Sequence, residues 1–581
     1  MNDFIQRLRE RKLVQWALAY IAAAFAFIQV LDVVAQRFGW PDQLEKLLIL
    51  ALAIGFFVTL VLAWYHGERG AQKVTATELS ILALLLAIGG SLLWHYEHAA
   101  PAQIAASSAP AQSIPAKSIA VLPLTNASGD KNEQFFSDGL SENLITALSQ
   151  FSGLKVIGRN SAFQFRDSKD DSKTIGANLG VATLLEGSVQ HAGDEVRINA
   201  ELIKAADGST LWSQRYDRPY KDLFKLQDEI TQAVATALKS KLLASDNAAA
   251  QSDHPPSGNL DAYTAYLQGK FYYARSTEAD FHKAIDAYTT AIRLDPQYAL
   301  AWAELSHTWS DLAAGYLSDA PAQQAYAQAR AAVTTALTLE PNLAAAHSAR
   351  GGLLVRADFD WAGAEVEYHR ALQLAPHDGD AMHNLGIIVA ILGQPERATA
   401  LARQALATDP LTARWHQWLA TYLAALDRLD EAEQTVRKAI ELQPAADSLH
   451  ERLTIIEIQR GDAKAALAAA QQEPAAGGWQ ESALALAQQI SGDRAAADAA
   501  LKTLIDKQAD SSAYQIAEVY ALRKDADNTF MWLDRAWAAR DPGVTYLLTD
   551  PFILRYQHDP RFAAFCKKVG LPTTTEAKAM P

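Results

Sequence analysis

The sequence has a single cysteine, Cys566, among 581 residues. One cysteine excludes an internal disulfide and any metal site built from several thiolates. Basic residues are also outnumbered, with 52 Lys and Arg against 66 Asp and Glu and a formal net charge of −14. Because phosphate binding needs clustered Lys and Arg, which no long stretch supplies, we expect no nucleic-acid partner.

The motifs that mark common reaction chemistry are missing as well. The sequence contains no HExxH zinc motif, no Walker loop, no dinucleotide-binding glycine pattern and no nucleophile elbow. His95 and His98 are spaced for one helix face, but the end of an apolar helix explains them equally well. We therefore expect no enzyme, no catalytic residue, no cofactor and no bound metal, and an enzyme without a known motif stays an alternative.

What the sequence has instead is a repeated phrase that ends in proline. It reads AIRLDP at 291–296, ALTLEP at 336–341, ALQLAP at 371–376, ALATDP at 405–410 and AIELQP at 439–444. The last three copies lie 34 residues apart. This period predicts a two-helix unit that buries its apolar face only by stacking on further copies.

The copies resemble the tetratricopeptide repeat, because residues of the required size fall on its packing positions. In the unit that ends at Pro410 these positions are Met382, Leu385, Gly386, Val389, Ala398, Ala402 and Ala405. The resemblance implies an all-α solenoid of about eight repeats over 259–546, with a cap and tail at 547–581. The unit between Pro296 and Pro341 holds 11 extra residues, which we expect near Ala314–Gln324.

Three apolar runs, 13–35, 47–65 and 79–95, come long before the repeats. Their lengths predict three transmembrane helices within 13–96, after a basic lead at 1–12. Because basic residues near membrane helices stay in the cytoplasm, the later domains are expected to be periplasmic. We thus expect a multi-pass protein of the inner (cytoplasmic) membrane. The side of the membrane on which the later domains lie depends on whether the short third run inserts.

A second globular segment separates these runs from the repeats. It is bounded by Ala/Ser/Pro-rich residues 97–116 and by residues 246–258, both of which we expect to be linkers. Hydrophobic patterns between the linkers predict strands at 118–124, 155–157, 183–190, 195–204 and 210–216, and helices at 132–150, 174–179 and 222–243. Turn signals between the last three strands predict an antiparallel meander.

Segment 117–245 resembles the TolB amino-terminal-like, or FlgO-like, domain. The resemblance rests on SIAVLPLTNASGD, FFSDGLSENLITALSQ, LKVIGRNSAFQF and LLEGSVQHAGDEVRINAELIKAADGSTLWSQRYDRP. This family occurs between a membrane segment and tetratricopeptide repeats in CadC-like transcription regulators and in some adenylate cyclases. Only about a dozen residues precede the first apolar run, so we expect neither a winged helix nor a cyclase domain ahead of it.

Together these features predict a multi-domain chain with N-terminal transmembrane helices, an α/β domain with a mixed sheet and a C-terminal all-α solenoid. Tetratricopeptide solenoids bind peptides on their concave surface. The resemblance places seven candidate partner-binding residues there: His307, Ser310, Asp380, His383, Arg414, Gln417 and Thr421. We expect a scaffold or sensor that binds proteins or peptides, and the alternative is a regulator of a separate cytoplasmic cyclase or transcription factor.

Overall fold

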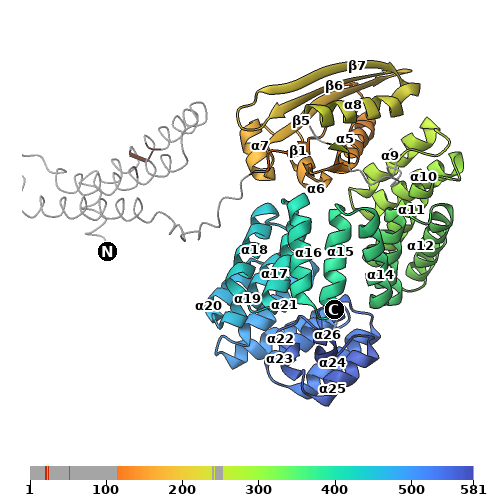
Figure 1. Ribbon diagram of the computed structural model, residues 1–581. Helices are drawn as coiled ribbons and strands as arrows, with labels where there is room; N and C mark the ends of the chain where they lie inside the picture. Colours follow the sequence, from red (N-terminus) through yellow and green to blue (C-terminus); the bar gives the residue numbers. More distant parts are fainter. Residues whose placement is uncertain are drawn as a thin grey trace, which may run out of the picture. The chain divides into compact units, whose positions relative to one another are not determined.

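The computed structural model describes residues 114–238, 241–242 and 253–579, together with the isolated positions Tyr20, Ile21, Ala24 and Leu52. The chain divides into two compact units, Met1–Ser113 and Ile114–Pro581. The second unit holds a sheet domain followed by helical repeats (Figure 1). A mixed-sheet domain followed by a helical repeat region agrees with the prediction from the sequence.

The predicted transmembrane helices at 13–35, 47–65 and 79–95 fall outside the described residues, apart from a few isolated positions. Among the residues that are described, no helix has the length and apolar character needed to cross a bilayer. The longest of them, Asp319–Leu339, is rich in alanine, glutamine and threonine rather than in large apolar residues. This finding corrects the transmembrane part of the expected fold class and the expected inner-membrane location with periplasmic domains.

The sheet domain is built on a mixed sheet with the strand order β4-β1-β5-β6-β7, in which β2 also pairs with β5. Its strands are β1 (Ser118–Val121), β2 (Thr125–Asn126), β4 (Lys155–Val156), β5 (Thr183–Ala192), β6 (Glu195–Lys204) and β7 (Thr210–Pro219). Strand β1 runs parallel to both of its neighbours, whereas β5, β6 and β7 form an antiparallel meander. The predicted meander is confirmed. Two short strands, β3 (Phe151–Ser152) and β8 (Lys241–Leu242), pair separately.

Helices cover both faces of this sheet. They are α5 (Gln134–Ser149), α6 (Arg159–Ala162), α7 (Ser172–Leu179) and α8 (Leu223–Ala237). Apolar residues of α5 and α8, such as Leu144 and Ile230, belong to one buried cluster with the inward residues of β6. Residues of α7 form a second cluster with Ala120 and Leu184. This helix begins at an N-cap, Asp171, and ends at Gly180, which has the positive φ that glycine tolerates best.

The repeat region consists of eight successive helix pairs within residues 260–538. The helices are α9 (Leu260–Tyr273), α10 (Glu278–Leu294), α11 (Ala299–Tyr316), α12 (Asp319–Leu339), α13 (Ala344–Leu353), α14 (Trp361–Leu374), α15 (Gly379–Ile391), α16 (Pro395–Thr408), α17 (Ala413–Ala425), α18 (Leu429–Leu442), α19 (Leu449–Arg460), α20 (Ala463–Gln472), α21 (Trp479–Gln488), α22 (Arg494–Gln508), α23 (Ala513–Leu522) and α24 (Ala526–Ala538). The 11 extra residues near Ala314–Gln324 lengthen α11 and α12 to 18 and 21 residues. They therefore form no separate loop.

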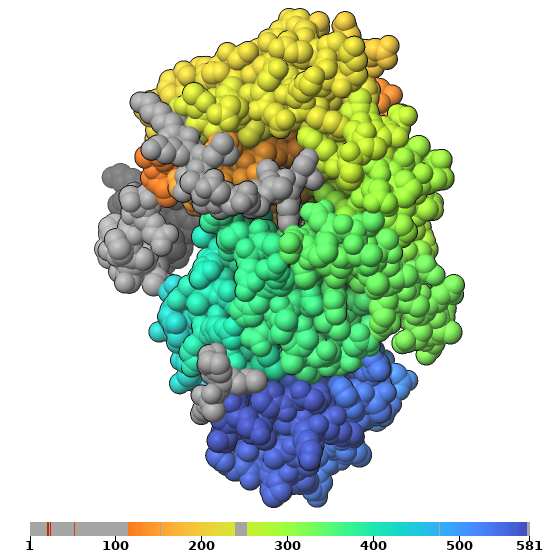
Figure 2. Space-filling model, turned by 45° about the vertical axis from the view of Figure 1, so that its right-hand side comes forward, coloured from red at the N-terminus to blue at the C-terminus, as the bar shows by residue number. Residues whose placement is uncertain are grey.

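The segment after α24 packs back on the repeats. It contains η6 (Pro542–Tyr546), η7 (Ile553–Tyr556), α25 (Pro560–Lys568) and α26 (Thr574–Ala579). Phe552, Phe562 and Phe565 are buried in the same cluster as the last helix pair, as expected for a cover. The indole N–H of Trp361 also donates to the Val569 carbonyl at 3.2 Å, so this segment reaches α14 as well. Figure 2 shows the resulting contact between the C-terminal segment, in blue, and the middle repeats, in green.

Small residues allow the two helices of a pair to approach closely, but the space at each position differs. A Cβ atom at Gly269 would lie 2.4 Å from Cε1 of the fully buried Tyr288. At Gly386 the nearest atoms would lie 3.6 Å away, which is ordinary contact. The pair α9–α10 thus needs glycine, whereas the pair α15–α16 has room for alanine.

We expect Gly269→Ala to lower the free energy of unfolding by about 1–3 kcal/mol, because the added methyl group overpacks a buried interface. Gly386→Ala is the matched control, and it should be neutral or stabilising by up to about 1 kcal/mol, since alanine favours helix over glycine. Thermal unfolding followed by circular dichroism measures both. Equal effects of the two substitutions would contradict the packing described above.

Candidate functional site

The candidate site is the concave surface that the first helices of stacked repeat pairs form, called the groove below. Neighbouring first helices contact one another, as α11 does α13 and α17 does α19, and the sheet domain borders this surface. The sheet domain contacts the repeats at two places, which lie far apart in the sequence. The first contact joins α5 to α9. Lys270 pairs with Glu142 at 2.5 Å, and Arg159 pairs with the other oxygen of the same carboxylate. Burial alone would raise the pKa of Glu142, but the charges of Lys270 and Arg159 outweigh it and lower that pKa.

The second contact joins α6 to the turn between α16 and α17. The backbone N–H of Gly158 donates to the Thr408 carbonyl at 2.9 Å, and the backbone N–H of Ser161 donates to Oδ1 of Asp409 at 2.6 Å. In return, the backbone N–H of Leu411 donates to the Ser161 hydroxyl at 2.9 Å. The sheet domain therefore contacts both the first and the middle repeats. Helix α6 lies at the edge of the groove, next to the middle repeats.

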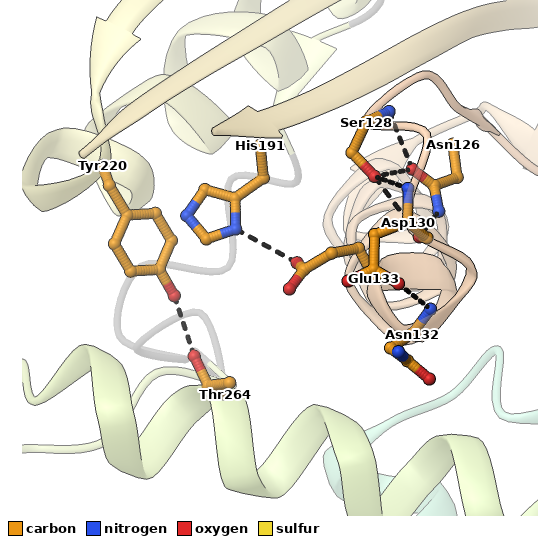
Figure 3. A network of polar contacts seen from close by, with 8 residues as sticks. All are labelled: Asn126, Ser128, Asp130, Asn132, Glu133, His191, Tyr220 and Thr264. Carbon is orange, nitrogen blue, oxygen red and sulfur yellow. Dashed lines mark hydrogen bonds and ion pairs between the residues drawn. The ribbon is translucent and has the colours of Figure 1, made fainter. Parts of the chain in front are cut away.

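Further polar contacts fasten the sheet domain where it meets α9 (Figure 3). The Tyr220 hydroxyl lies 2.8 Å from Oγ1 of Thr264 in α9. The His191 ring contacts the rings of Phe136 and Tyr220, and its Nδ1 lies 3.1 Å from a carboxylate oxygen of Glu133. The Tyr220 contact joins the sheet domain to α9, and the other contacts hold the His191 ring in place, so we assign them a structural role.

The far end of the groove is filled by the chain itself. Tyr546 of η6 stacks on Trp418 with 5.3 Å between ring centroids, and the guanidinium of Arg452 lies 5.2 Å from the centroid of the same tyrosine ring. The Tyr514 hydroxyl donates to Asp550, just beyond η6, at 3.0 Å. In the part of the chain that the structure describes, this segment covers Trp418 of α17 and contacts α15. The stretch left to a partner therefore runs from α11 to the first turns of α15 and α17.

The structure places the seven predicted residues on α11, α15 and α17, but not all of them are accessible. Asp380 and Arg414 are exposed, and His307 and Gln417 are partly exposed. Ser310, His383 and Thr421 are buried. Thr421 donates to the Gln417 carbonyl within its own helix, and Gln417 donates to the Ser448 hydroxyl at 2.6 Å. The accessible subset is therefore Asp380, Arg414 and His307.

Sequence reasoning missed several charged residues of this groove. Glu304 precedes His307 by one turn of α11, and Asp311 follows it by another, so all three lie on one face. Asp311 pairs with Arg356 at 3.1 Å and accepts a hydrogen bond from Tyr273 at 2.5 Å. Glu304 and Asp311 lie on the same helix as the predicted His307 and Ser310, but not at the positions carried over from the repeat. Arg356 lies in a π-helical turn, so the repeat pattern found none of the three. The helical spacing of Glu304, His307 and Asp311 could have shown from the sequence that these charged residues share one helix face.

The groove also perturbs the acids that line it. Burial raises the pKa of Glu304 and of Asp378, the N-cap of α15. Asp380 is exposed at the surface, yet desolvation by the surrounding protein raises its pKa to about 7, and Asp378, Asp409 and Glu304 add repulsion. For His383, burial and then the nearby Arg414 charge lower the pKa to about 3, so the ring is neutral.

Two other observations concern alternative sites. A shallow hollow lined by His347, Val366, Glu367, His369, Arg370 and Gln373 lies on α13 and α14, and it shares no residue with the groove. In the part of the chain that the structure describes, no group of three or more His, Cys, Asp or Glu side chains is arranged to hold a metal ion.

Two family models match parts of the chain. The second domain of HilA/YgeH-like transcriptional regulators matches residues 115–233, and the tetratricopeptide repeat matches residues 413–445. The chain thus contains a HilA/YgeH-like regulator domain and at least one tetratricopeptide repeat. The TolB amino-terminal-like, or FlgO-like, identity expected for 117–245 is not confirmed by these matches.

A curated relative is the protein named "Putative adenylate cyclase 3" of Rhizobium meliloti (strain 1021). It is 39% identical over 209 residues, which cover 36% of this chain and 35% of the relative. The chain therefore spans about a third of the length of the relative that it matches. This similarity agrees broadly with the expected resemblance to cyclases that share this domain order.

Several solved structures of repeat proteins are similar to the chain. PilW, a type IV pilus biogenesis factor, is 21% identical with a TM-score of 0.32, covering 37% of this chain and 92% of PilW. YrrB, described as a TPR protein with an unusual peptide-binding site, is 20% identical with a TM-score of 0.27. The match covers 38% of this chain and 99% of YrrB. A thermophilic TPR protein of Thermus thermophilus is 21% identical with a TM-score of 0.28. The match covers 34% of this chain and 99% of that protein. These scores are too low to carry an argument about function.

Asp409 couples the sheet domain to the repeats, and its titration should affect stability. It is only 5% exposed, and burial raises its pKa to about 6 despite the hydrogen bonds from Ser161 and Asn160. Because the folded pKa lies above the unfolded one, the folded state is favoured at low pH and loses this advantage as pH rises from about 4 through 6.

We therefore expect Asp409→Asn to unfold at a higher temperature than the wild type at pH 8, with a gain of about 2 kcal/mol that vanishes near pH 4. Asparagine keeps the acceptor oxygen without the buried charge. The exposed Asp510→Asn is the control, and it should change stability by less than about 0.5 kcal/mol at any pH. Parallel stability profiles of Asp409→Asn and the wild type across pH would contradict this assignment.

Proposed function

We propose that this chain is a protein-interaction module that binds a segment of a partner protein in the groove between α11 and α17. One observation carries the proposal: the open part of the groove presents charged side chains that its own fold does not use. Asp380 and Arg414 are exposed and form no ion pair with any residue that the structure describes. Stacked repeats of this type commonly use the concave surface to bind extended or helical peptides.

The closed end of the groove supports the same interpretation. Tyr546 and the residues after it occupy the surface of α17 and α19 in the manner of a bound segment, with one stacked ring and one cation–π contact. The repeats are thus able to hold a polypeptide at this surface, and the free stretch from α11 to α17 offers the same kind of surface to a partner. In this interpretation the chain acts as a scaffold or sensor and carries out no reaction itself.

A second candidate is a regulatory role toward a separate cyclase or transcription factor. The HilA/YgeH-like match at residues 115–233 and the similarity to a protein named as an adenylate cyclase favour it. Because the chain spans about a third of that relative, its catalytic activity is not carried over to this chain. The two candidates share the groove and differ in which protein binds there.

Site-specific photo-crosslinking in the native cell tests the proposal. A benzophenone amino acid in place of the exposed Arg414 should yield a discrete adduct with another protein, because it lies in the open groove. The same residue in place of Lys438, on the second helix of its pair, is the matched control and should not yield that adduct. An identical adduct from both positions, or none from Arg414, would argue against partner binding in the groove. A cyclase or DNA-binding domain in the adduct would favour the regulatory candidate.

A further inference from the structure

One edge of the sheet domain is a long strand without an outer neighbour. Strand β7 has 10 residues and lies at the end of the strand order β4-β1-β5-β6-β7. Among the residues that the structure describes, it pairs with β6 alone. Figure 1 shows it as the outermost strand, on the side of the sheet domain away from the repeats. Such an edge offers a row of unpaired backbone groups to a further strand.

The register of β7 shows which of its backbone groups point outward. The Tyr220 N–H donates to the Asp194 carbonyl at 2.7 Å, so these two residues form a hydrogen-bonded pair where β6 and β7 begin to align. Hydrogen-bonded and non-hydrogen-bonded pairs alternate along an antiparallel ladder. Every second residue before Tyr220 therefore bonds to β6. The N–H and C=O groups that point away from β6 belong to the residues in between, Ser213, Arg215 and Asp217.

Two features bound the stretch of β7 that can pair with another strand. A β-bulge leaves Leu211 without an opposite residue on β6, and a bulge bends and twists the strand that carries it. At the other end, Pro219 has no N–H to donate on its outward side. The free stretch thus runs from Ser213 to Pro219, and its middle residue is Tyr216.

The side chains next to this midpoint carry opposite charges. Arg215 precedes Tyr216 and Asp217 follows it, and both charged side chains are exposed. Arg197 of β6 and Arg215 lie 2.5 and 2.8 Å from the Asp217 carboxylate oxygens, which holds this acid on the solvent face of the sheet. Charged residues on an edge strand discourage pairing with most other strands. The same stretch in the opposite direction, however, places an arginine opposite an aspartate.

We propose that β7 is a self-association edge, which pairs antiparallel with β7 of a second copy about a two-fold axis at Tyr216. In this register Arg215 of each copy lies opposite Asp217 of the other, and the outward N–H and C=O groups of both residues bond across the axis. Pairing centred on Arg215 or on Asp217 would place two like charges opposite one another, which disfavours it. This inference goes beyond the proposed function and does not depend on it.

A dimer of this kind has a consequence for partner binding. Strand β7 contributes no residue to the groove, so each copy keeps its own groove on α11, α15 and α17. A partner that carries two binding segments would then gain affinity, because binding of the first segment raises the effective concentration of the second.

Sedimentation velocity of the purified full chain, at increasing protein concentration, tests this pairing by exchange of charges. We expect the wild type to show a monomer–dimer equilibrium. Arg215→Glu and Asp217→Arg should each weaken dimerisation about tenfold, because each places like charges opposite one another at two symmetric positions. An equimolar mixture of the two variants should recover the dimer, since every facing pair then has opposite charges.

The matched control is Arg403→Glu, which reverses one exposed arginine outside the sheet domain, on α16. It should leave dimerisation unchanged, and thermal unfolding should confirm that all three variants are folded. A wild type that stays monomeric, an equal loss in the control or a mixture that does not recover the dimer would each overturn the inference. None of these outcomes affects the proposed function, because pairing at β7 and binding in the groove use different surfaces.

Discussion

One apolar core shared by the sheet domain and the first repeats fixes the rest of this structure. Leu140 and Leu144 of α5 belong to the same buried cluster as Tyr263 and Tyr266 of α9. Gly139 makes this possible, because a Cβ atom there would lie 2.6 Å from a methyl carbon of Leu267. Burial of large aromatic side chains is among the strongest sources of stability. The sheet domain is therefore an extension of the solenoid core rather than a separate body on a linker.

This shared core determines what the groove can do. It places α6 against the turn at Thr408–Leu411, where Asp409 accepts backbone hydrogen bonds, so the groove is bordered at one edge by the sheet domain. The C-terminal segment closes the other end at Trp418. What remains is a short, charged surface on α11, α15 and α17. Asp380 and Arg414 are exposed on it and form no ion pair with any residue that the structure describes, which is why we assign this surface to a partner.

The sequence predicted the parts of the fold that depend on local patterns. The 34-residue period identified the helix pairs, and turn signals identified the meander of β5, β6 and β7. The transmembrane and inner-membrane expectations, drawn from apolar runs, were corrected. The contact between Ser161 and Asp409 could not be predicted from the sequence. It depends on how far the stack of helix pairs curves, and small rotations from several pairs add up to that curvature. The groove residues were partly found: Asp380 and Arg414 are accessible, and Ser310 is buried. Glu304 was missed because it does not fall on a position that the repeat carries over to the concave surface.

Hydrogen exchange of the full chain, with and without the partner protein captured by the crosslinker at Arg414, tests the central claim that a partner binds in the groove between α11 and α17. We expect slower exchange in Ala299–Tyr316 and Gly379–Ile391, with no change in Leu429–Leu442, the second helix of its pair. Protection confined to second helices, or to the hollow on α13 and α14, would contradict this claim.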